Sequence, residues 1–479
     1  MHFFRAAPAT LLSCFLLVAG YAVTSATPAA AHAEATLLVE ADSGKVLEAE
    51  NATFPWHPAS LTKVMTAYVT LKAVKDGKIK LDTLLTVSPH AAAEKPSKMG
   101  FPPGTQVTVD NALKMMMVKS ANDMAVVLAE GVGGSVDGFS AMMNQTAARL
   151  GMTQTTYVNP NGLPDDRQVT SARDLAILAR AFIHDLSEYE YFVHIPAIRY
   201  GRRVTHNFNK LIGRFPGADG MKTGFICASG FNLMATATQN GRRLIAVVLG
   251  ASSSQMRSIK AIKLLERGFS GGNNLTWLRP ALGTVDNLAP IAAAPPDLRD
   301  DICGPRRKRP ASDDPEDDTL ASVVENNPAL SFFADGLKAP TLRPEDMLAA
   351  APAPAEPVIV YTGPAKSGAE LIAAAAADAA AQEAAAAKYR KSRAARRHGR
   401  KAHASTDSKG NKRITVTIDT KKKQAAGTKS ADAGEARSKP HAKPAEKPTA
   451  HKPAAKPTAA KLAPKGKPKH ASGNTKPKN

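Results

Sequence analysis

Residues 57–69, with the sequence HPASLTKVMTAYV, combine an apolar helix pattern with two reactive side chains, and this limits the folds open to the chain. Pro58 suits a first helical turn, where its missing N–H costs nothing. Apolar residues follow at helical spacing, at Leu61, Val64, Met65, Tyr68 and Val69. Ser60 and Lys63, three residues apart, share one face of this helix. An amine beside a serine hydroxyl can take its proton once burial or nearby cations lower the amine's pKa, so the stretch predicts a nucleophilic serine.

Two later motifs strengthen this prediction. Alone, Ser-x-x-Lys is a weak pattern, which an N-cap serine beside a solvated lysine explains better than catalysis does. Residues 120–122 read Ser-Ala-Asn, directly after an apolar run, and residues 222–224 read Lys-Thr-Gly. The second motif begins about 57 residues after Lys63, and the third begins about 100 residues after Asn122. This order is typical of penicillin-binding proteins and serine β-lactamases.

The chain resembles the low-molecular-weight D-alanyl-D-alanine carboxypeptidases, the serine peptidases among the penicillin-binding proteins, over roughly residues 34–270. Three further stretches resemble that family, at 37–44 (LLVEADSG), 159–163 (NPNGL) and 170–175 (TSARDL). The resemblance implies a catalytic domain over residues 34–272. Its fold would be mixed α/β (α+β) and β-lactamase/DD-peptidase-like, with an antiparallel sheet flanked by helices plus a helical subdomain. The implied activity is removal of the terminal D-alanine from peptidoglycan pentapeptides.

The resemblance assigns three residues to catalysis and six to substrate binding. Ser60 would attack the carbonyl between two D-alanines, Lys63 would act as general base, and Ser120 would pass a proton to the leaving D-alanine. The expected substrate-binding residues are Asn122, Lys222, Thr223, Gly224, Phe225 and Arg257. The oxyanion would lie between the backbone N–H groups of Ser60 and Phe225. β-Lactam antibiotics mimic the D-Ala-D-Ala end, so they should acylate the same serine.

Local patterns predict how the elements alternate. Strands are expected at 36–40 and 46–49, around a turn at 42–45. After the Ser60 helix, which turns at 76–77, helices are expected at 109–117, 123–132, 136–150, 172–183 and 254–269. Residues 157–167 should form an ordered loop. Segments 202–207, 217–225, 231–238 and 243–249 should return to the sheet, the last two around a hairpin turn at Asn240-Gly241.

The first 33 residues predict a secretory signal peptide. Their apolar run, residues 11–23, is too short to span a bilayer, and the small residues around His32 predict cleavage after Ala33. A lipoprotein signal ending at Cys14 is the weaker alternative, because few residues precede that cysteine. We therefore expect export across the inner membrane, to the periplasm or cell envelope.

The composition changes after residue 272. Residues 273–365, rich in Pro and Ala, predict a linker of uncertain structure in which 358–362 could be a lone strand. Relatives often carry a β-rich second domain and an anchoring amphipathic helix here, and neither pattern is clear. Within 366–479, an alanine-rich helix at 370–388 precedes a Lys/Pro/Ala tail that should be disordered.

The basic character of the chain belongs to its C-terminal part. From residue 361 onward there are 28 Lys and Arg against 8 Asp and Glu, whereas the first 360 residues hold 35 against 34. Such a tail binds polyanions with strong salt dependence. Because the chain should be exported, we expect a polyanionic envelope component as the tail's partner and no specific nucleic acid.

Two cysteines remain after the predicted cleavage, Cys227 and Cys303. In an oxidising compartment such a pair favours a disulfide, although two unpaired thiols remain the alternative. Neither cysteine has the histidine setting of a nucleophile, and no Cys/His cluster has metal spacing. We therefore expect no metal and no cofactor.

Three alternatives to a carboxypeptidase were weighed on the sequence. A class A β-lactamase needs a glutamate in a Glu-x-x-x-Asn type context between the second and third motifs, and Glu130, Glu188 and Glu190 lack it. A peptidoglycan DD-endopeptidase would share the whole site and stays open. A non-enzymatic envelope-binding protein, led by the basic tail, is the alternative from another class.

Overall fold

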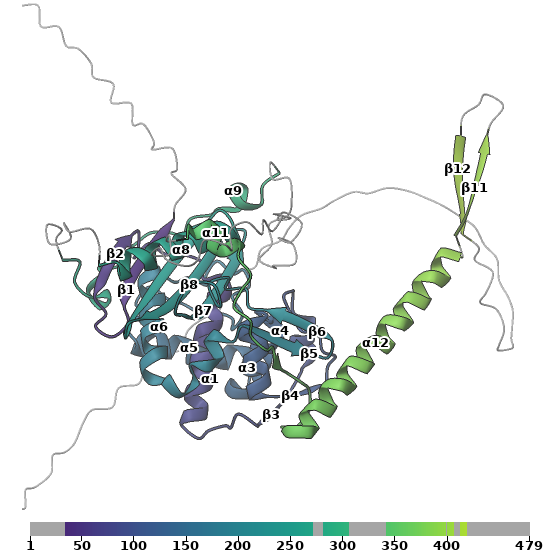
Figure 1. Cartoon of the computed structure of the whole chain (residues 1–479), viewed down its shortest axis with the longest axis horizontal. Coiled ribbons are helices and arrows are strands. Elements are labelled where there is room, and N and C mark those ends of the chain that lie inside the picture. The colour runs from purple at the N-terminus through teal and green to yellow at the C-terminus, as the bar shows by residue number, and fades with distance from the viewer. Residues whose placement is uncertain (1–33, 272–280, 306–341, 399, 407–411, 419–479) are drawn as a thin grey trace, which may run out of the picture. The chain divides into compact units, whose positions relative to one another are not determined.

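The computed structural model describes residues 34–271, 281–305, 342–398, 400–406 and 412–418 (Figure 1). The predicted signal peptide lies outside these residues. Residues 1–397 and 398–479 form two separate compact units, and each is considered by itself.

The first unit is built on a five-stranded antiparallel sheet, in the order β2-β1-β9-β8-β7. Its strands are β1 (Ala35–Glu40), β2 (Val46–Glu50), β7 (Ala218–Ile226), β8 (Gly230–Gln239) and β9 (Arg242–Ala251). The expected Asn-Gly turn joins β8 to β9, with positive φ at both Asn240 (51°) and Gly241 (74°). The order of the strands places β7, which carries the Lys-Thr-Gly motif, at an edge of the sheet.

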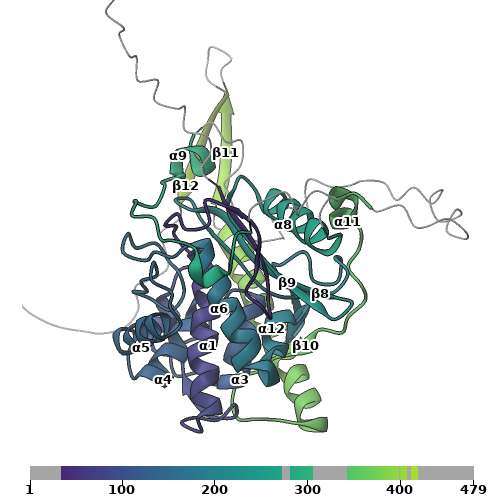
Figure 2. The same cartoon turned by 90° about the vertical axis from the view of Figure 1, so that its left-hand side faces the viewer.

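Helices cover both faces of this sheet. α8 (Ser254–Phe269) lies on one side, whereas α1 (Thr62–Lys75) and α6 (Ala172–Asp185) lie on the other (Figure 2). The helical region also contains α3 (Val109–Val118), α4 (Asn122–Gly133) and α5 (Val136–Arg149). α1 runs through the interior, and its residues Val64 and Met65 are fully buried. The fold class expected from the sequence is confirmed.

One strand lies in a different sheet from the one expected. Residues 203–206 do not return to the main sheet. They form β6 (Arg203–His206), which pairs with β5 (Ala197–Tyr200) in a separate three-stranded sheet. The other edge of β5 pairs with β10 (Val358–Ile359). The physical reason is local: the short turn at Gly201 (φ +55°) and Arg202 brings residues 203–206 back onto β5, while the turn η1 (Ala59–Leu61) packs against β7.

Short elements that the sequence did not indicate connect the larger ones. They are β3 (Leu84–Thr86), α2 (Pro89–Ala93), β4 (Gln106–Thr108), η2 (Ser187–Tyr189) and α7 (Tyr191–His194). Strands β3 and β4 pair with each other. Such three- to five-residue elements carry too little periodicity to be recognised from a sequence.

Residues beyond 272 also pack on this unit. Val285 in η4 (Val285–Asn287) and Ile302 in α9 (Arg299–Cys303) are buried, and a disulfide joins Cys303 to Cys227. α11 (Pro344–Ala349) packs on α8. The linker therefore contributes to the core of the first unit, and the predicted disulfide is present.

The alanine-rich helix is confirmed and is longer than expected. α12 spans Gly368–His398, and the Gln382 amide donates to the Tyr200 carbonyl oxygen at 3.2 Å. No helix among the described residues is both long enough and apolar enough to cross a membrane.

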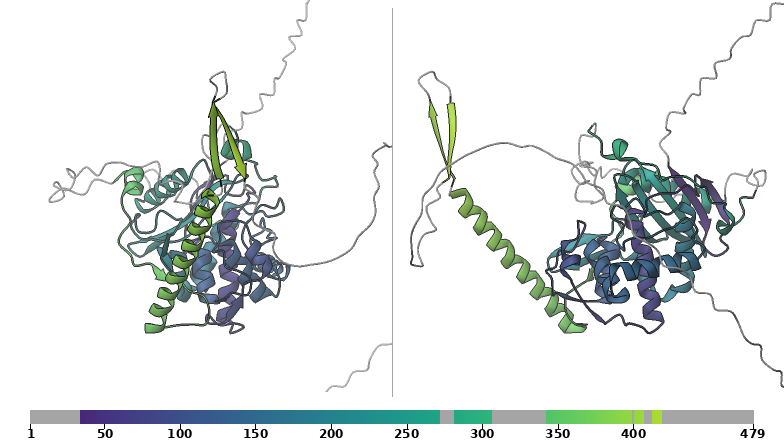
Figure 3. Two further views of the ribbon diagram at one scale, coloured as in Figure 1. Left: turned by 90° about the vertical axis from the view of Figure 1, so that its right-hand side faces the viewer. Right: turned by 180° about the vertical axis from the view of Figure 1, so that it is seen from behind.

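The described part of the second unit is a two-stranded hairpin, β11 (Arg400–Thr406) and β12 (Lys412–Ile418) (Figure 3). The sequence prediction had assigned these residues to a disordered tail, which is wrong for this stretch. The run Ile414-Thr-Val-Thr-Ile418 is entirely β-branched, which favours a strand. The rest of the predicted tail, residues 419–479, lies outside the described residues.

Candidate active site

Ser60 lies in the tight turn η1, which leads into α1. The preceding residue, Ala59, has φ +49°, in the left-handed region that costs an L-residue with a Cβ roughly 1–2 kcal/mol. The turn is closed by a hydrogen bond from Leu61 N–H to the Pro58 carbonyl oxygen (3.2 Å). One helical turn after the serine, Lys63 Nζ donates to Ser60 Oγ at 2.9 Å. The structure therefore brings the first predicted pair into direct contact.

The Lys63 amine is fully buried and has two further oxygen partners. Nζ donates to Asn122 Oδ1 at 2.7 Å and to the Asn161 carbonyl oxygen at 2.6 Å. Both oxygens can only accept, whereas a serine hydroxyl can also donate. When the lysine is neutral, its two N–H groups therefore bind the two asparagine oxygens, and its lone pair faces the Ser60 hydroxyl. This is the geometry that a general base for Ser60 requires.

The second motif lies where α3 ends and α4 begins. Asn122 is the first residue of α4, and its Nδ2 donates to the Lys95 carbonyl oxygen at 2.9 Å, which fixes Oδ1 toward Lys63. Ser120, two residues earlier, is only 5% exposed and has φ +59°. The described residues record no hydrogen bond for its hydroxyl. It lies two residues before Asn122, whose side chain contacts Lys63.

The third motif lies on β7, against the nucleophile turn. A Cβ on Gly224 would stand 3.0 Å from both Ser60 N and the Pro58 carbonyl oxygen, so only glycine permits this approach. Lys222 and Thr223 are each 1% exposed. The Thr223 hydroxyl is buried and has no hydrogen-bond partner among the described residues, which leaves it available to a ligand.

Phe225 belongs to the same strand, and Arg257 lies beside it. Arg257, on α8, is 1% exposed, and its Nη1 donates to the Gly224 carbonyl oxygen at 3.4 Å. The Phe225 ring stacks on Phe231, with the ring centroids 4.3 Å apart. Eight of the nine residues named from the sequence thus lie on η1, α1, the start of α4, β7 or α8, and Ser120 lies in the loop between α3 and α4.

Comparison with known proteins shows the family of the chain. Residues 22–253 match the model of a peptidase family described as D-alanyl-D-alanine carboxypeptidase. The carboxypeptidase DacA of Haemophilus influenzae is 35% identical over 278 residues, which cover 56% of this chain and 70% of the relative. The chain belongs to the D-alanyl-D-alanine carboxypeptidase family. The resemblance inferred from the sequence is therefore confirmed.

Other members of the family match over a similar region. DacC of Escherichia coli K12 is 40% identical over 256 residues, covering 52% of this chain and 64% of the relative. The alignment with it thus spans less than two thirds of its length. Among solved structures, penicillin-binding protein 5 of Haemophilus influenzae is 36% identical, with a TM-score of 0.49, 50% of this chain covered and 71% of that one.

The candidate site also includes a loop for which the sequence predicts no catalytic role. Asn161, whose carbonyl oxygen binds Lys63, is followed by Gly162 at φ +83°. A Cβ on Gly162 would lie 1.8 Å from the Ala59 carbonyl oxygen. The stretch Asn159–Leu163 had been noted only as a family resemblance, and its Asn-Pro-Asn-Gly sequence was the available signal.

Gln168 holds this loop on the nucleophile helix. Its Nε2 donates to Thr62 Oγ1 at 3.1 Å and to Asn159 Oδ1 at 3.0 Å. Its Oε1 accepts from the backbone N–H groups of Val158 and Asn159. All the hydrogen-bonding positions of this buried amide serve to fix the loop, and with it the Asn161 carbonyl oxygen.

Two carboxyl groups near this loop have shifted pKa values, for different reasons. At the exposed tip of the loop, hydrogen bonds from Arg167 lower the pKa of Asp165 to about 2. Behind the loop, burial raises the pKa of Asp174, although Thr155 and Arg173 bind its oxygens. Burial, with the charge of Asp174, also raises the pKa of Tyr157. The carboxyl group at the tip of the loop is therefore exposed to solvent, whereas the one behind the loop is buried.

The described residues contain no group of three or more His, Cys, Asp or Glu side chains that could hold a metal ion.

Proposed function

We propose that this chain is a serine-type D-Ala-D-Ala carboxypeptidase that removes the terminal D-alanine from peptidoglycan pentapeptides through an acyl-enzyme on Ser60. The observation that carries the proposal is the 2.9 Å contact between Lys63 Nζ and Ser60 Oγ, with the buried amine also bound to two asparagine oxygens. Membership of the carboxypeptidase family supports the same reaction.

In the first half of the reaction, Lys63 takes the hydroxyl proton as Ser60 Oγ attacks the carbonyl carbon of the penultimate D-alanine. The backbone N–H groups of Ser60 and Phe225 would stabilise the oxyanion, since β7 approaches the serine turn at Gly224. The C–N bond then breaks, and Ser120 passes a proton to the amine of the departing D-alanine. Water later hydrolyses the acyl-enzyme and restores the serine.

Substrate binding would use the exposed edge of the main sheet. Because β7 is an edge strand, an extended peptide could pair with it through main-chain hydrogen bonds. The Asn122 side chain would hold the substrate amide. The buried Thr223 hydroxyl, which has no partner within the described structure, would bind the terminal carboxylate. Lys222 and Arg257 would supply positive potential there.

We further propose that the protein is exported and works in the periplasm or cell envelope. The predicted signal peptide and the Cys227–Cys303 disulfide support this location, since disulfides persist in oxidising compartments. The basic tail would tether the enzyme to a polyanionic envelope component.

The deciding experiment is the intact mass of the mature protein after incubation with benzylpenicillin, with Ser60→Ala as the matched control. We expect one adduct per chain, which disappears in Ser60→Ala. D-alanine release from a pentapeptide, compared with cleavage of a cross-linked dimer, would then separate a carboxypeptidase from a DD-endopeptidase. A folded wild-type protein that forms no adduct would refute the proposal and leave the tail as the leading account of function.

A further inference from the structure

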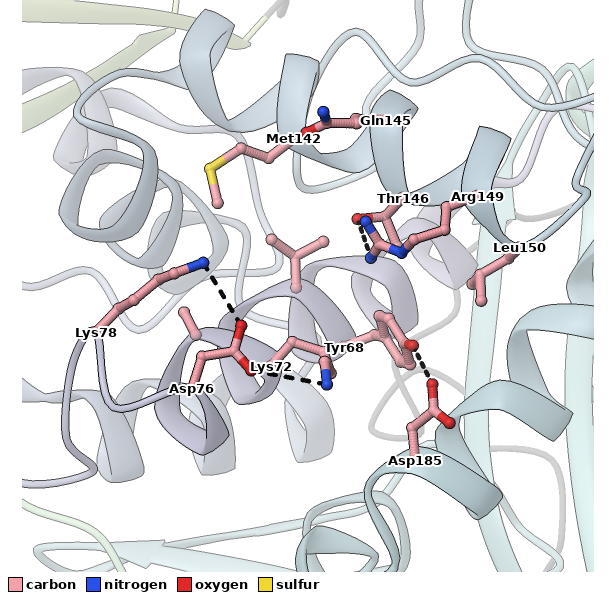
Figure 4. A pocket seen from close by; sticks show the side chains of 12 residues that line it. Tyr68, Lys72, Asp76, Lys78, Met142, Gln145, Thr146, Arg149, Leu150 and Asp185 are labelled. Atoms are coloured by element: carbon pink, nitrogen blue, oxygen red, sulfur yellow. Dashed lines mark hydrogen bonds and ion pairs between the residues drawn. The ribbon is translucent and has the colours of Figure 1, made fainter. Parts of the chain in front are cut away.

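A cavity of about 430 Å³ opens between α1, α5 and the end of α6 (Figure 4). It lies along the C-terminal half of α1, from Tyr68 to Asp76, whereas Ser60 precedes the first turn of that helix. At 1.5 Å of rise per residue, Lys72 is roughly 18 Å along the axis from Ser60. None of the nine residues of the candidate active site lines this cavity. It is therefore a separate site.

The cavity has an apolar part and a cationic part. The apolar lining comes from Val69, Ala73, Met142 and Leu150. Three cationic side chains, Lys72, Lys78 and Arg149, face two carboxylates, Asp76 and Asp185. Its volume lies within the range of small-molecule sites.

The two carboxylates are already engaged. Asp76 is shared between Lys72 (3.8 Å) and Lys78 (3.5 Å), so one negative charge serves two lysines. Asp185 accepts a hydrogen bond from the Tyr68 hydroxyl. Burial and this carboxylate raise the pKa of Tyr68, so the tyrosine remains a donor to Asp185.

Arg149 is left with weaker, uncharged partners. Its Nη2 donates to the Thr146 hydroxyl at 3.3 Å and its side chain also interacts with the Tyr68 hydroxyl, whereas no ion pair joins it to a carboxylate within the described part of the chain. Its planar guanidinium presents several donors in a fork that matches a carboxylate or a phosphate. The exposed guanidinium, beside two lysines that share one aspartate, gives the cavity an excess of positive charge.

We propose that this cavity binds a small organic anion, whose carboxylate or phosphate group pairs with Arg149 and Lys72 and whose apolar part packs on Val69 and Met142. The site is independent of the chemistry at Ser60. It would be occupied by an acidic solute and not by the scissile end of the substrate.

Calorimetric titration of the full mature chain tests this site with two anionic probes, N-acetyl-D-alanine for the carboxylate and inorganic phosphate for the phosphate group. The amide of N-acetyl-D-alanine is the uncharged control. We expect at least one of the anions to bind and the amide not to bind. Arg149→Ala should weaken binding about tenfold or more, because a hydrogen bond to a charged group is lost. Whichever anion binds identifies the head group.

Two control variants show where the probe binds. Thr223→Ala removes the hydroxyl proposed to bind the substrate carboxylate, so it should lose only binding at the candidate active site and keep the binding that Arg149→Ala removes. Lys45→Ala removes an exposed charge elsewhere and should bind the probe as the wild type does. Lys72→Ala provides a second test if Arg149→Ala lowers the melting temperature. Binding that survives both Arg149→Ala and Lys72→Ala, binding lost only in Thr223→Ala, or no binding of either anion at millimolar concentration would each overturn the proposal.

Discussion

Asn122 Oδ1 lies 2.7 Å from Lys63 Nζ, although 59 residues separate the two in the sequence. The contact links the second motif to the first through a buried amine. Because Asn122 Oδ1 accepts one N–H of Lys63, the contact also orients the amine relative to the Ser60 hydroxyl.

Changing Asn122 should alter both the rate and the pH dependence of Ser60 acylation. Asn122→Ala removes one acceptor of the Lys63 N–H groups and should slow acylation by benzylpenicillin about 10- to 100-fold. Asn122→Asp places a carboxylate beside the amine, which favours the ammonium form and raises the pKa of Lys63. Because only the neutral amine can act as base, the rising limb of the acylation pH profile should move to higher pH in Asn122→Asp. An unchanged profile in this variant would contradict the proposed role of Lys63.

Gly162→Ala should lower the free energy of unfolding because the added Cβ clashes with Ala59, in addition to straining the backbone. At Gly134, φ is also positive (+73°), but nothing lies within 4 Å of an added Cβ. Gly134→Ala should therefore lose about 1 kcal/mol of unfolding free energy, from backbone strain alone. Gly162→Ala adds the clash with Ala59 and should lose roughly 3 kcal/mol, measured by urea denaturation. It should also slow acylation of Ser60, whereas Gly134→Ala should not, and equal effects of the two variants would argue against the clash.

Cys303→Ser should destabilise the protein without removing the active site. The disulfide closes a segment of 76 residues, and its loss should cost about 4 kcal/mol by the loop-entropy relation. A reducing agent should lower the melting temperature of the wild type toward that of Cys303→Ser and leave the variant unchanged. A wild type indifferent to reduction would show that the bond does not stabilise the fold.

The Asp165 carboxyl group should titrate at unusually low pH. Hydrogen bonds from Arg167 hold the pKa of Asp165 at about 2, so Arg167→Ala should raise it toward the ordinary value of about 3.9. Because the folded-state pKa is the lower one, this pair contributes stability above about pH 4 and loses that contribution as the pH falls toward 2. Carboxyl NMR titration of both proteins measures the shift, and identical titration curves would show that the loop tip does not keep this pair in solution.

The basic tail should govern adhesion to polyanions and not catalysis. A chain that ends after residue 398 should bind anionic lipid vesicles much more weakly than the full chain at low salt, while benzylpenicillin acylates both equally. Binding of the full chain should fall steeply as salt is raised, because counterion release drives it. Equal vesicle binding by the two chains at low salt would refute a tether.

The motif residues could be predicted because each requires a particular chemistry at a fixed place. Ser60, Lys63 and Asn122 are specified by side-chain type and order, and the turn at Asn240-Gly241 by its positive φ angles. The Asn161 carbonyl oxygen could not be predicted in the same way, because every residue has one and only the folded loop aims it at Lys63. The pairing of β6 with β5 also escaped prediction, since a strand pattern does not say which edge is free. The cavity beside Arg149 depends on the spacing of three helices, which no local pattern records.

Because of the Cys227–Cys303 disulfide, the covalent structure of a molecule would differ before and after its export. If the signal peptide directs export, both thiols stay reduced while the chain is synthesised in the cytosol, and the bond can form only on the far side of the membrane. A newly exported molecule would then carry α9 without its covalent link to the end of β7. Maturation would depend on the supply of oxidant in the envelope, so cells deprived of that supply would accumulate a protease-sensitive form of an otherwise intact enzyme.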